Sequence, residues 1–455
     1  MKDPKQLDDY QDVGARHLAG GGLIGRAALC DDPGLGKTAQ AVRAMDFLNQ
    51  RRALVICPAA VRDVWIDEFE RWGYMDRRVI SITQDTQLGA WLDLKIDVGV
   101  VSYEYATSRK KYFMDDIIPA IIIDEAHYLK NKNAARTRRI LGGDADGRGG
   151  LIEMSGNTMW LTGTPMMNQP LDIWTLLRSH GATRLSLTDF ERQFFTLVWE
   201  KNKPVLKVAD GRIQELRDIV SSVVLRRSKK LLNLPPMRAT TLNIRGDQSE
   251  ILALLKEFPG LDAAIMDAVD QGSLSFLDAQ HIGTLRRLTA EAKAPGFADY
   301  LVEQFKGGLD CCVVIGVHTK ALRIIQGVLE KAGLRVGVIT GQPANNYERD
   351  RGQMVKDFQA GKLDVILGNI IAAGVGVTLT RANTIFMFET DWVAMQNVQA
   401  LARIDRKGQL RRTLAYFVSL ANSVDQRVTE KVKQKVEQIL AVDPTALDGS
   451  LFEDQ

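Results

Sequence analysis

The segment CDDPGLGKT, residues 30–38, combines residue types that bind phosphate groups. It lies between an apolar run and a helical pattern, so its backbone N–H groups would surround an anion at a helix N-terminus. Gly34 and Gly36 let the backbone approach phosphate oxygens closely, while Lys37 can reach the β- and γ-phosphates. The Thr38 hydroxyl can bind Mg²⁺. The segment therefore predicts a nucleotide-binding loop with magnesium.

A pair of acidic residues strengthens this prediction. The loop pattern is incomplete, because Asp31 occupies its first glycine position, and a chance glycine-rich turn is the alternative. The later sequence AIIIDEAH places Asp124 and Glu125 directly after an apolar strand pattern, where open α/β sheets bind ligands. Hydrolysis needs one carboxylate to hold Mg²⁺ and another group to orient water. We expect Asp124 to bind the metal and Glu125 to act on the attacking water.

A third element is WLTGTP, in which Thr162, Gly163 and Thr164 follow another strand pattern. Two small hydroxyls beside a glycine suit a sensor that links nucleotide state to the rest of the protein. A Thr/Gly turn is the alternative for this motif alone. Its order in the chain, after GKT and DEAH, favours the sensor.

A fourth element, QALARIDRKGQ, lies in the second half of the chain. Arg403 and Arg406 are three residues apart, so on a helix they would share a face. An arginine from an opposing domain can stabilise charge on the γ-phosphoryl oxygens in the transition state. A solvated basic helix end is the alternative. We expect these arginines to act as fingers when two lobes close.

Two blocks of apolar runs, joined by helical patterns, must position these motifs. Runs that are apolar on both faces indicate parallel strands buried between helices. We therefore expect an α/β fold with two doubly wound parallel-sheet lobes. The expected strands are Ala27–Cys30, Ala53–Cys57, Val79–Ile82, Val98–Ser102, Ile121–Ile123, Met159–Leu161, Cys311–Val317, Val336–Ile339, Val365–Leu367, Thr384–Phe388 and Leu414–Val418.

The stretches between the strand blocks predict insertions and a boundary. Residues 166–222 and 248–304 have mostly amphipathic, helical patterns, and Pro235–Pro236 marks a connector between them. We place an N-terminal lobe at residues 1–229 and a C-terminal lobe, ending in a helix, at residues 230–455. The glycine-rich segment Gly142–Gly150 is interpreted as a flexible, solvated loop.

Composition narrows the class of protein. The 455 residues carry 59 Lys and Arg, 56 Asp and Glu, and a net charge of +3, so any nucleic-acid surface must be local. No apolar run approaches the ~20 residues of a membrane span, and the first residues do not predict a secretory signal. The four cysteines have no CxxC spacing, which predicts buried free thiols in a reducing compartment. We expect an intracellular protein, cytoplasmic or nucleoid-associated, or nuclear in a eukaryote.

In this order, the motifs resemble those of the Swi/Snf-type ATPases of helicase superfamily 2, across nearly the whole chain. DDPGLGKT is similar to the family's DEMGLGKT, and VLRRSKKLLNLPP resembles its connector between lobes. AAGVGVTLTRANTIFMFETDW resembles motif V and QALARIDRKGQ resembles motif VI. The resemblance implies two RecA-like lobes, helical protrusions, ATP and Mg²⁺ as cofactors, and a DNA-dependent ATPase.

The resemblance also assigns residues. LDDYQDVG is similar to the family's adenine-side motif, which implies ATP contacts from Tyr10 and Gln11. Within the phosphate loop, Leu35 would join the ATP-binding residues. Roles in coupling are implied for His127 and Gly376, and DNA contacts for Ser102, Lys130 and Thr378. Thr378 replaces the usual Asn of chromatin remodellers and, with RRLTAEAK, favours the annealing-helicase-like branch.

Three functions are compatible with these motifs. The first is a monomeric ATP-driven translocase on double-stranded DNA, with largely sequence-independent binding through basic clusters. The second is a strand-separating DNA or RNA helicase, although the sequence shows no obvious wedge module. The third is a nucleotide-gated clamp without hydrolysis, which the retained Glu125, Arg403 and Arg406 disfavour. The basic clusters are Arg109–Lys111, Arg136–Arg139, Arg226–Lys230, Arg286–Arg287 and Arg403–Arg412.

Overall fold

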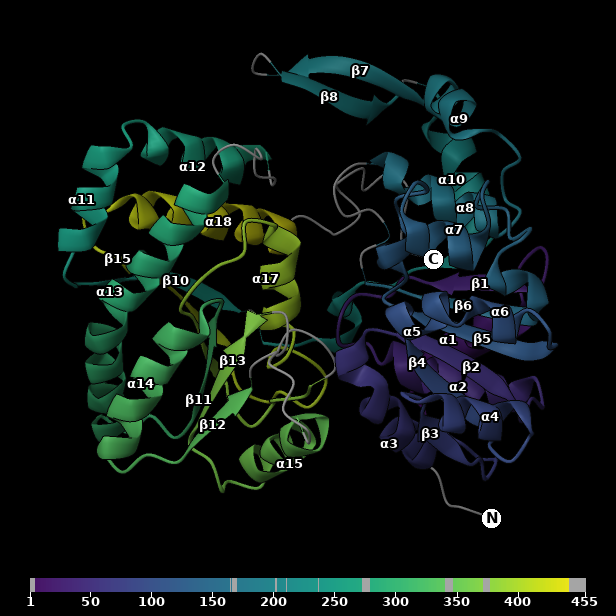
Figure 1. Cartoon of the computed structure of the whole chain (residues 1–455), viewed down its shortest axis with the longest axis horizontal. Helices are drawn as coiled ribbons and strands as arrows, with labels where there is room; N and C mark the ends of the chain where they lie inside the picture. Colours follow the sequence, from purple (N-terminus) through teal and green to yellow (C-terminus); the bar gives the residue numbers. More distant parts are fainter. Residues whose placement is uncertain are drawn as a thin grey trace. The chain divides into compact units, whose positions relative to one another are not determined.

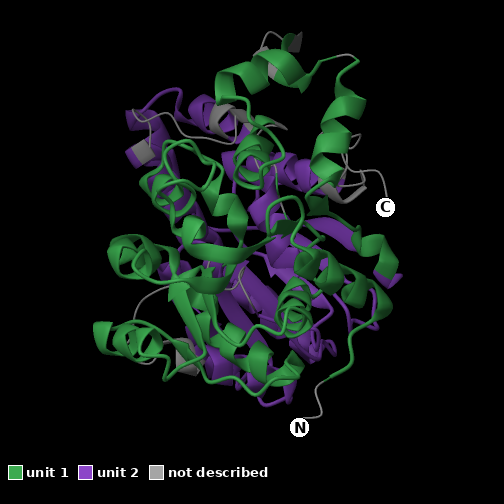
Figure 2. Cartoon of the chain, turned by 90° about the vertical axis from the view of Figure 1, so that its right-hand side faces the viewer, with its two compact units in different colours: residues 1–231, 443–455 green, residues 232–442 purple. Residues whose placement is uncertain are grey.

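The computed structural model divides into two compact units, the first ending at Leu231 and the second spanning Leu232–Val442 (Figure 2). The structure describes residues 5–163, 165, 170–200, 203–209, 211–235, 237–271, 279–339, 347–370 and 377–441. The division falls inside the short 3-10 turn Lys229–Leu232. The sequence-based boundary after residue 229 lies in the same turn.

The first unit is built on a seven-stranded parallel sheet with the order β3-β4-β2-β5-β6-β1-β9 (Figure 1). Its central strands are buried on both faces because helices cover the sheet, and this burial explains their continuous apolar sequences. The strands are β1 (Arg26–Leu29), β2 (Ala53–Cys57), β3 (Val79–Ser81), β4 (Val98–Ser102), β5 (Ile118–Asp124), β6 (Ser155–Leu161) and β9 (Val224–Leu225).

Ten helices accompany this sheet in the part of the first unit that the structure describes. Several begin at polar caps: Ser102 accepts a hydrogen bond from Tyr105 N, and Ser186 accepts one from Asp189 N. The helices are α1 (Asp9–Gly20), α2 (Lys37–Phe47), α3 (Arg62–Trp72), α4 (Asp85–Leu92), α5 (Tyr103–Ser108), α6 (Lys110–Phe113), α7 (Ala135–Leu141), α8 (Trp174–Ser179), α9 (Leu187–Phe194) and α10 (Ile213–Ser221).

The insertion expected to be helical also contains a β-hairpin. Strands β7 (Phe195–Glu200) and β8 (Lys203–Val208) pair antiparallel, directly after α9 (Figure 1). Phe195 and Val208, at the base of the hairpin, are buried in the core, whereas Leu197 and Val198 are exposed. The helical interpretation is wrong for residues 195–208, where β7 is rich in β-branched and aromatic residues and pairs with β8.

The second unit is built on a six-stranded parallel sheet with the order β10-β15-β14-β11-β13-β12 (Figure 1). Alternate residues of β11 pack into different cores: Val313 and Ile315 into one, Cys312 and Val314 into the other. Both faces of this sheet are therefore buried, as expected for a doubly wound lobe. The strands are β10 (Arg238–Ile244), β11 (Cys312–Gly316), β12 (Val336–Ile339), β13 (Val365–Asn369), β14 (Thr384–Met387) and β15 (Leu414–Leu420).

The described helices of the second unit include the long α13, which contains Pro295 and contacts α14. With both sheets parallel, the two doubly wound α/β lobes expected from the sequence are confirmed. The helices are α11 (Ser249–Glu257), α12 (Leu261–Gln271), α13 (Ala279–Lys306), α14 (Thr319–Lys331), α15 (Tyr347–Gln359), α17 (Ala394–Leu401) and α18 (Val424–Ala441).

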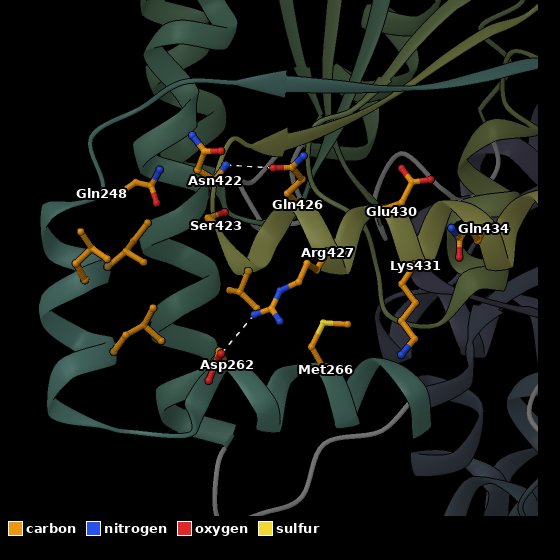
Figure 3. Close-up of a pocket in the computed structure, with 14 residues that line it drawn as sticks. Gln248, Asp262, Met266, Asn422, Ser423, Gln426, Arg427, Glu430, Lys431 and Gln434 are labelled. Atoms are coloured by element: carbon orange, nitrogen blue, oxygen red, sulfur yellow. Dashed lines mark hydrogen bonds and ion pairs between the residues drawn. The ribbon is translucent and has the colours of Figure 1, made fainter. Parts of the chain in front are cut away.

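A pocket of about 840 Å³ lies between α11, α12 and α18 of the second unit (Figure 3). Arg427 and Asp262 form an ion pair across it, at 3.3 Å. Leu252, which lines the pocket, is exposed. This pocket belongs to the second unit, whereas the phosphate loop belongs to the first.

The glycine-rich segment Gly142–Gly150 is solvated only in part: Gly143, Asp144, Arg148 and Gly149 are exposed, whereas Gly142, Ala145, Gly147 and Gly150 are buried. The interpretation as a solvated loop therefore holds for only part of the segment. Ala145 is buried in the main core of the first unit and adopts a left-handed conformation, with a φ of 53°. Arg26 Nη1 donates a hydrogen bond to the Asp146 carbonyl at 3.3 Å. The prediction of buried free thiols is confirmed for all four cysteines, and burial raises the pKa of Cys30 to about 12.

Candidate nucleotide-binding site

The predicted phosphate loop connects β1 to the N-terminus of α2. Gly34 and Gly36 have φ angles of 100° and 80°, which a side chain would disfavour. A Cβ atom on Gly36 would also overlap the Gln11 amide nitrogen. The sequence therefore needs glycine at 36 for both the backbone turn and the close approach of α1. Helix α2 begins at Lys37, so Lys37 and Thr38 lie in its first turn, where backbone N–H groups can bind an anion.

Lys37 folds back onto its own loop. Its Nζ atom donates hydrogen bonds to the carbonyl oxygens of Asp31, at 2.7 Å, and Asp32, at 3.4 Å. These carbonyls hold the ammonium group at the loop, where a phosphate would compete for it. The role of Lys37 in binding phosphates remains a prediction.

The adenine-side residues meet the loop at the Leu35 carbonyl. This oxygen accepts hydrogen bonds from Tyr10 Oη at 3.3 Å, Gln11 Nε2 at 3.1 Å and Gln40 Nε2 at 3.2 Å. The structure thus brings Tyr10 and Gln11 together with the loop, as the sequence predicts. Gln40, in α2, is a further contact that no sequence motif indicated.

Asp124 ends β5, and Glu125 follows it in a strained conformation. Glu125 has a φ of 51°, in the left-handed region that non-glycine residues rarely adopt. Asp124 accepts hydrogen bonds from Trp65 Nε1 at 3.0 Å and from Glu125 N at 2.9 Å. Tyr103 donates its hydroxyl to the Asp124 carbonyl at 2.7 Å. These contacts fix the orientation of the predicted metal-binding carboxylate.

Burial, together with the charge of Glu125, raises the pKa of the Asp124 carboxyl to about 6. The hydrogen bond from Trp65 and the charge of Lys37 oppose this rise. Lys37 and Asp124, which are far apart in the sequence, therefore act on one another in the folded lobe. A buried carboxylate near an ammonium group is suited to a divalent cation, which would favour its ionised form.

His127 links the acidic pair to the third motif. Its Nδ1 atom lies 3.2 Å from Glu125 Oε2 and 3.2 Å from the Thr162 hydroxyl. Gly163 lies against the phosphate loop, because a Cβ atom there would be 2.9 Å from Pro33 and 3.4 Å from Lys37 Nζ. The structure thus connects three of the predicted motifs. Thr164 lies outside the described residues.

Arg403 and Arg406 lie in the second unit, and the prediction that a helix carries both of them is wrong. Helix α17 ends at Leu401, and both arginines follow it in consecutive turns. The Gln409 side-chain amide donates hydrogen bonds to the carbonyl oxygens of Ala382, at 2.7 Å, and Ile404, at 3.2 Å. These hydrogen bonds stabilise the turns that are found where the sequence predicts a helix. Arg406 Nη1 donates to the Val377 carbonyl at 3.4 Å.

The DNA contacts implied by the resemblance lie in both units. Ser102 ends β4, and its hydroxyl caps α5. Lys130 lies 3.7 Å from Asp172. Thr378 is half-buried in the segment before β14, and Gly376 lies outside the described residues. These DNA contacts remain predictions.

Several residues of the basic clusters are already paired with acidic side chains of the protein. Arg109 pairs with Asp85 and Arg287 with Glu291. Arg226 and Arg227 are buried and bind Asp32 and Asp31 of the phosphate loop. The interpretation of these two arginines as part of a phosphate-tracking surface is therefore wrong, because their charge is used inside the lobe.

The donor set fits magnesium with ATP. Asp124 and Thr38 offer a carboxylate and a hydroxyl, and Mg²⁺ prefers one or two such ligands together with phosphate oxygens and water. The described residues hold no cluster of three or more His, Cys, Asp or Glu side chains that would bind a metal without a nucleotide. Within the same residues, no helix is long and apolar enough to cross a membrane.

Two family models match the chain. The SNF2-related domain matches residues 22–293, more than half of the chain, and the helicase conserved C-terminal domain matches residues 298–408. The first match contains the phosphate loop, the acidic pair Asp124–Glu125 and the WLTGTP motif. The second carries Arg403 and Arg406.

Curated relatives and a solved structure are similar to the chain. One is the SWI/SNF-related matrix-associated actin-dependent regulator of chromatin subfamily A-like protein 1 of Xenopus tropicalis, 26% identical over 90% of this chain and 42% of its own length. Another is the human DNA annealing helicase and endonuclease ZRANB3, 24% identical over 91% of this chain and 38% of its own. The Sulfolobus solfataricus SWI2/SNF2 ATPase core in complex with dsDNA is 20% identical, with a TM-score of 0.45, over 99% of this chain and 96% of that one.

The chain spans about two fifths of the length of these curated relatives. The Swi/Snf resemblance is confirmed by the SNF2-related domain model, which covers the phosphate loop, the acidic pair and the WLTGTP motif. The chain belongs to the SNF2-related family.

Proposed function

We propose that this chain is an ATP-driven translocase that tracks along double-stranded DNA. One observation carries the proposal: Lys37, Asp124, Glu125 and the Thr162 sensor are connected within one lobe of a chain that matches the SNF2-related family. That arrangement has the parts that nucleotide hydrolysis requires.

Each part has a specific task in hydrolysis. The Lys37 ammonium would leave the loop carbonyls and neutralise charge on the β- and γ-phosphates. Thr38 and Asp124 would hold Mg²⁺, which neutralises the charge that develops on the phosphates. Glu125 would orient the attacking water and accept its proton. Arg403 and Arg406 are proposed to stabilise the transferred phosphoryl group.

The His127 contacts support coupling between hydrolysis and movement. The surroundings of Glu125 would change when water or phosphate leaves, and His127 connects Glu125 to Thr162, directly after the neighbouring strand β6. Because buried hydrogen-bonded groups have few alternative arrangements, this chain of contacts can pass a change at the γ-phosphate to the neighbouring strand.

Double-stranded DNA is the proposed substrate because of the names of the relatives. They are described as chromatin regulators and as a DNA annealing helicase, and the solved ATPase core is a complex with dsDNA. The clusters Arg136–Arg139 and Arg403–Arg412 are proposed to bind phosphates of the duplex, without reading bases.

Triplex displacement and fork unwinding test this proposal together. We expect ATP-dependent displacement of a third strand from duplex DNA, little unwinding of a forked duplex, and neither activity in Lys37→Ala. Efficient fork unwinding, abolished when the β7–β8 hairpin is shortened, would instead support the strand-separating alternative. Absence of both activities in a protein that hydrolyses ATP would contradict translocation.

A further inference from the structure

Two arginines at the end of the first unit bind the acidic residues of the phosphate loop. Arg227 contacts both carboxylate oxygens of Asp31, with Nε at 3.0 Å and Nη2 at 2.5 Å. Arg226 Nη2 lies 3.4 Å from the Asp32 carboxylate. We call Asp31, Asp32, Arg226 and Arg227 the connector clamp, because the arginines precede the unit boundary after Leu231 by only a few residues.

The Arg227–Asp31 pair is desolvated and fully bonded. Asp31 is 0% exposed and Arg227 is 7% exposed. Gln40 completes the network, because it donates to Asp31 Oδ2 at 3.1 Å and accepts from Arg227 Nη2 at 2.6 Å. A buried ion pair is tolerated only when its remaining hydrogen-bonding groups are satisfied, and Gln40 contributes to that here.

Arg227 reaches the adenine side of the pocket as well. Its Nη1 atom donates to the Tyr10 carbonyl, and its guanidinium lies over the Tyr10 ring, 5.3 Å from the ring centre. One side chain from the end of the sheet therefore touches α1, α2 and the phosphate loop. The backbone adds a further link, since Asp32 N donates to the Arg227 carbonyl at 3.0 Å.

Gly14 makes room for this arrangement. A Cβ atom at Gly14 would overlap Gln40 Oε1 and lie 2.5 Å from Arg227 Nη2. Glycine in the middle of α1 costs helix stability, roughly 0.5–1 kcal/mol relative to alanine. The close approach of Gln40 and Arg227 accounts for a glycine at this position.

We propose that Arg227 is a positioning residue that couples the connector between the units to the nucleotide pocket. The inference rests on the proposed binding of ATP at the phosphate loop. Asp31 places a negative charge beside the site of the phosphates, and Arg227 neutralises that charge while holding the loop against α1. A shift of the connector would thus alter the pocket, and nucleotide binding would in turn restrain the connector.

Neutralisation of Asp31 by Arg227 can be distinguished from a purely structural ion pair by nucleotide affinity. Arg227→Met leaves Asp31 unneutralised beside the phosphates and should weaken binding of a fluorescent ATP analogue about tenfold or more. Adding Asp31→Asn to Arg227→Met removes the uncompensated negative charge of Asp31 and its repulsion of the phosphates. The double variant should therefore bind the analogue more tightly than Arg227→Met alone. Gly14→Ala should also weaken binding, since it displaces the guanidinium without changing any charge.

Arg77→Met is the matched control. Arg77 pairs with Asp46 at 2.7 Å, with side-chain exposures of 1% and 5%, so it is an equally buried pair in the same unit but outside the pocket. We expect it to lower the unfolding temperature as Arg227→Met does, while affinity for the ATP analogue stays at the wild-type level. Binding is measured without DNA, beside thermal unfolding of each variant.

The outcomes separate the inference from the proposed function. If the wild-type protein binds the analogue but DNA does not stimulate its ATP turnover, the proposed function is contradicted. The role of the connector clamp can still be tested in that case, because its measure is affinity for the analogue. If Arg227→Met and Gly14→Ala fold and bind the analogue as tightly as wild type, Arg227 has only a structural role. The inference is also overturned if the double variant binds no better than Arg227→Met.

Discussion

His127 Nδ1 lies 3.2 Å from the Thr162 hydroxyl, although the two residues are 35 positions apart. Both side chains are buried, and His127 also contacts Glu125. The contact joins the residue proposed to activate water to the strand end that precedes the sensor motif.

Thr162→Val should uncouple hydrolysis from nucleotide binding. Valine keeps the shape of threonine but offers no hydrogen bond to His127, so we expect turnover to fall about tenfold with nucleotide affinity unchanged. Steady-state turnover and binding of an ATP analogue measure the two effects. Thr158→Val is the control, because Thr158 lies buried in β6, the strand that precedes Thr162, and its hydroxyl has no hydrogen-bond partner among the described residues. Equal turnover in both variants would argue against the coupling role.

Lys37→Ala should abolish ATP hydrolysis and leave the first unit folded. The substitution removes the ammonium group that would neutralise the β- and γ-phosphates, and among the described residues Lys37 donates hydrogen bonds to the loop carbonyls of Asp31 and Asp32 alone. DNA-stimulated turnover and thermal unfolding are compared with those of Lys95→Ala, an exposed position. Near-normal turnover in the folded Lys37 variant would show that the loop does not bind the reacting phosphates.

Arg403→Ala and Arg406→Ala should each retain nucleotide binding and lose hydrolysis. A finger arginine is typically worth about 10³–10⁵ in rate, because it stabilises charge that develops only in the transition state. Single-turnover hydrolysis at saturating ATP measures the loss. Arg323→Ala, at an exposed position of α14 in the same unit and outside the basic clusters, should behave as wild type. If both finger variants hydrolyse ATP as fast as Arg323→Ala, Arg403 and Arg406 are only a basic surface.

Acidification should destabilise the first unit through His180. Burial lowers the pKa of this imidazole to about 4, and its Nδ1 atom lies 2.8 Å from the Leu176 carbonyl. The unfolded chain therefore binds a proton that the folded lobe excludes, so stability falls as the pH drops from about 6.5 towards 4, by up to about 3 kcal/mol.

Unfolding by urea at several pH values measures how the free energy of unfolding changes with pH. His180→Asn keeps an N–H donor but has no titratable group, so its stability should change less between pH 7 and 4.5. An identical slope in wild type and His180→Asn would assign the pH dependence to other groups, such as His17, whose pKa is also lowered by burial.

Apolar runs predict the strands that are buried on both faces. β2 and β4 begin and end where their runs do, because helices cover both faces of the sheet. β10 is missed by this criterion, since it is an edge strand whose residues are exposed or half-buried except for Ile244. β9 is missed because it is only two residues long and pairs with β1 by tertiary contact.

The sequence predicts those parts of the candidate site in which the functional residues are neighbours along the chain. The phosphate loop, the acidic pair and the sensor are such segments. Their partners could not be predicted in this way: Gln40 and Arg227 are 187 residues apart, and Trp65 lies in a helix with no phosphate chemistry. Two adjacent arginines also read as a basic surface until the fold places them beside Asp31 and Asp32.

ATP turnover measured in parallel with duplex DNA, single-stranded DNA, RNA and no nucleic acid tests the central claim most directly. We expect stimulation by duplex DNA that varies little with its sequence and weakens steeply as salt rises, because the proposed contacts are to phosphates. Single-stranded DNA and RNA should stimulate far less, and Lys37→Ala should show no turnover with any of them. Stimulation by RNA or single strands but not by duplex DNA would contradict a double-stranded DNA translocase.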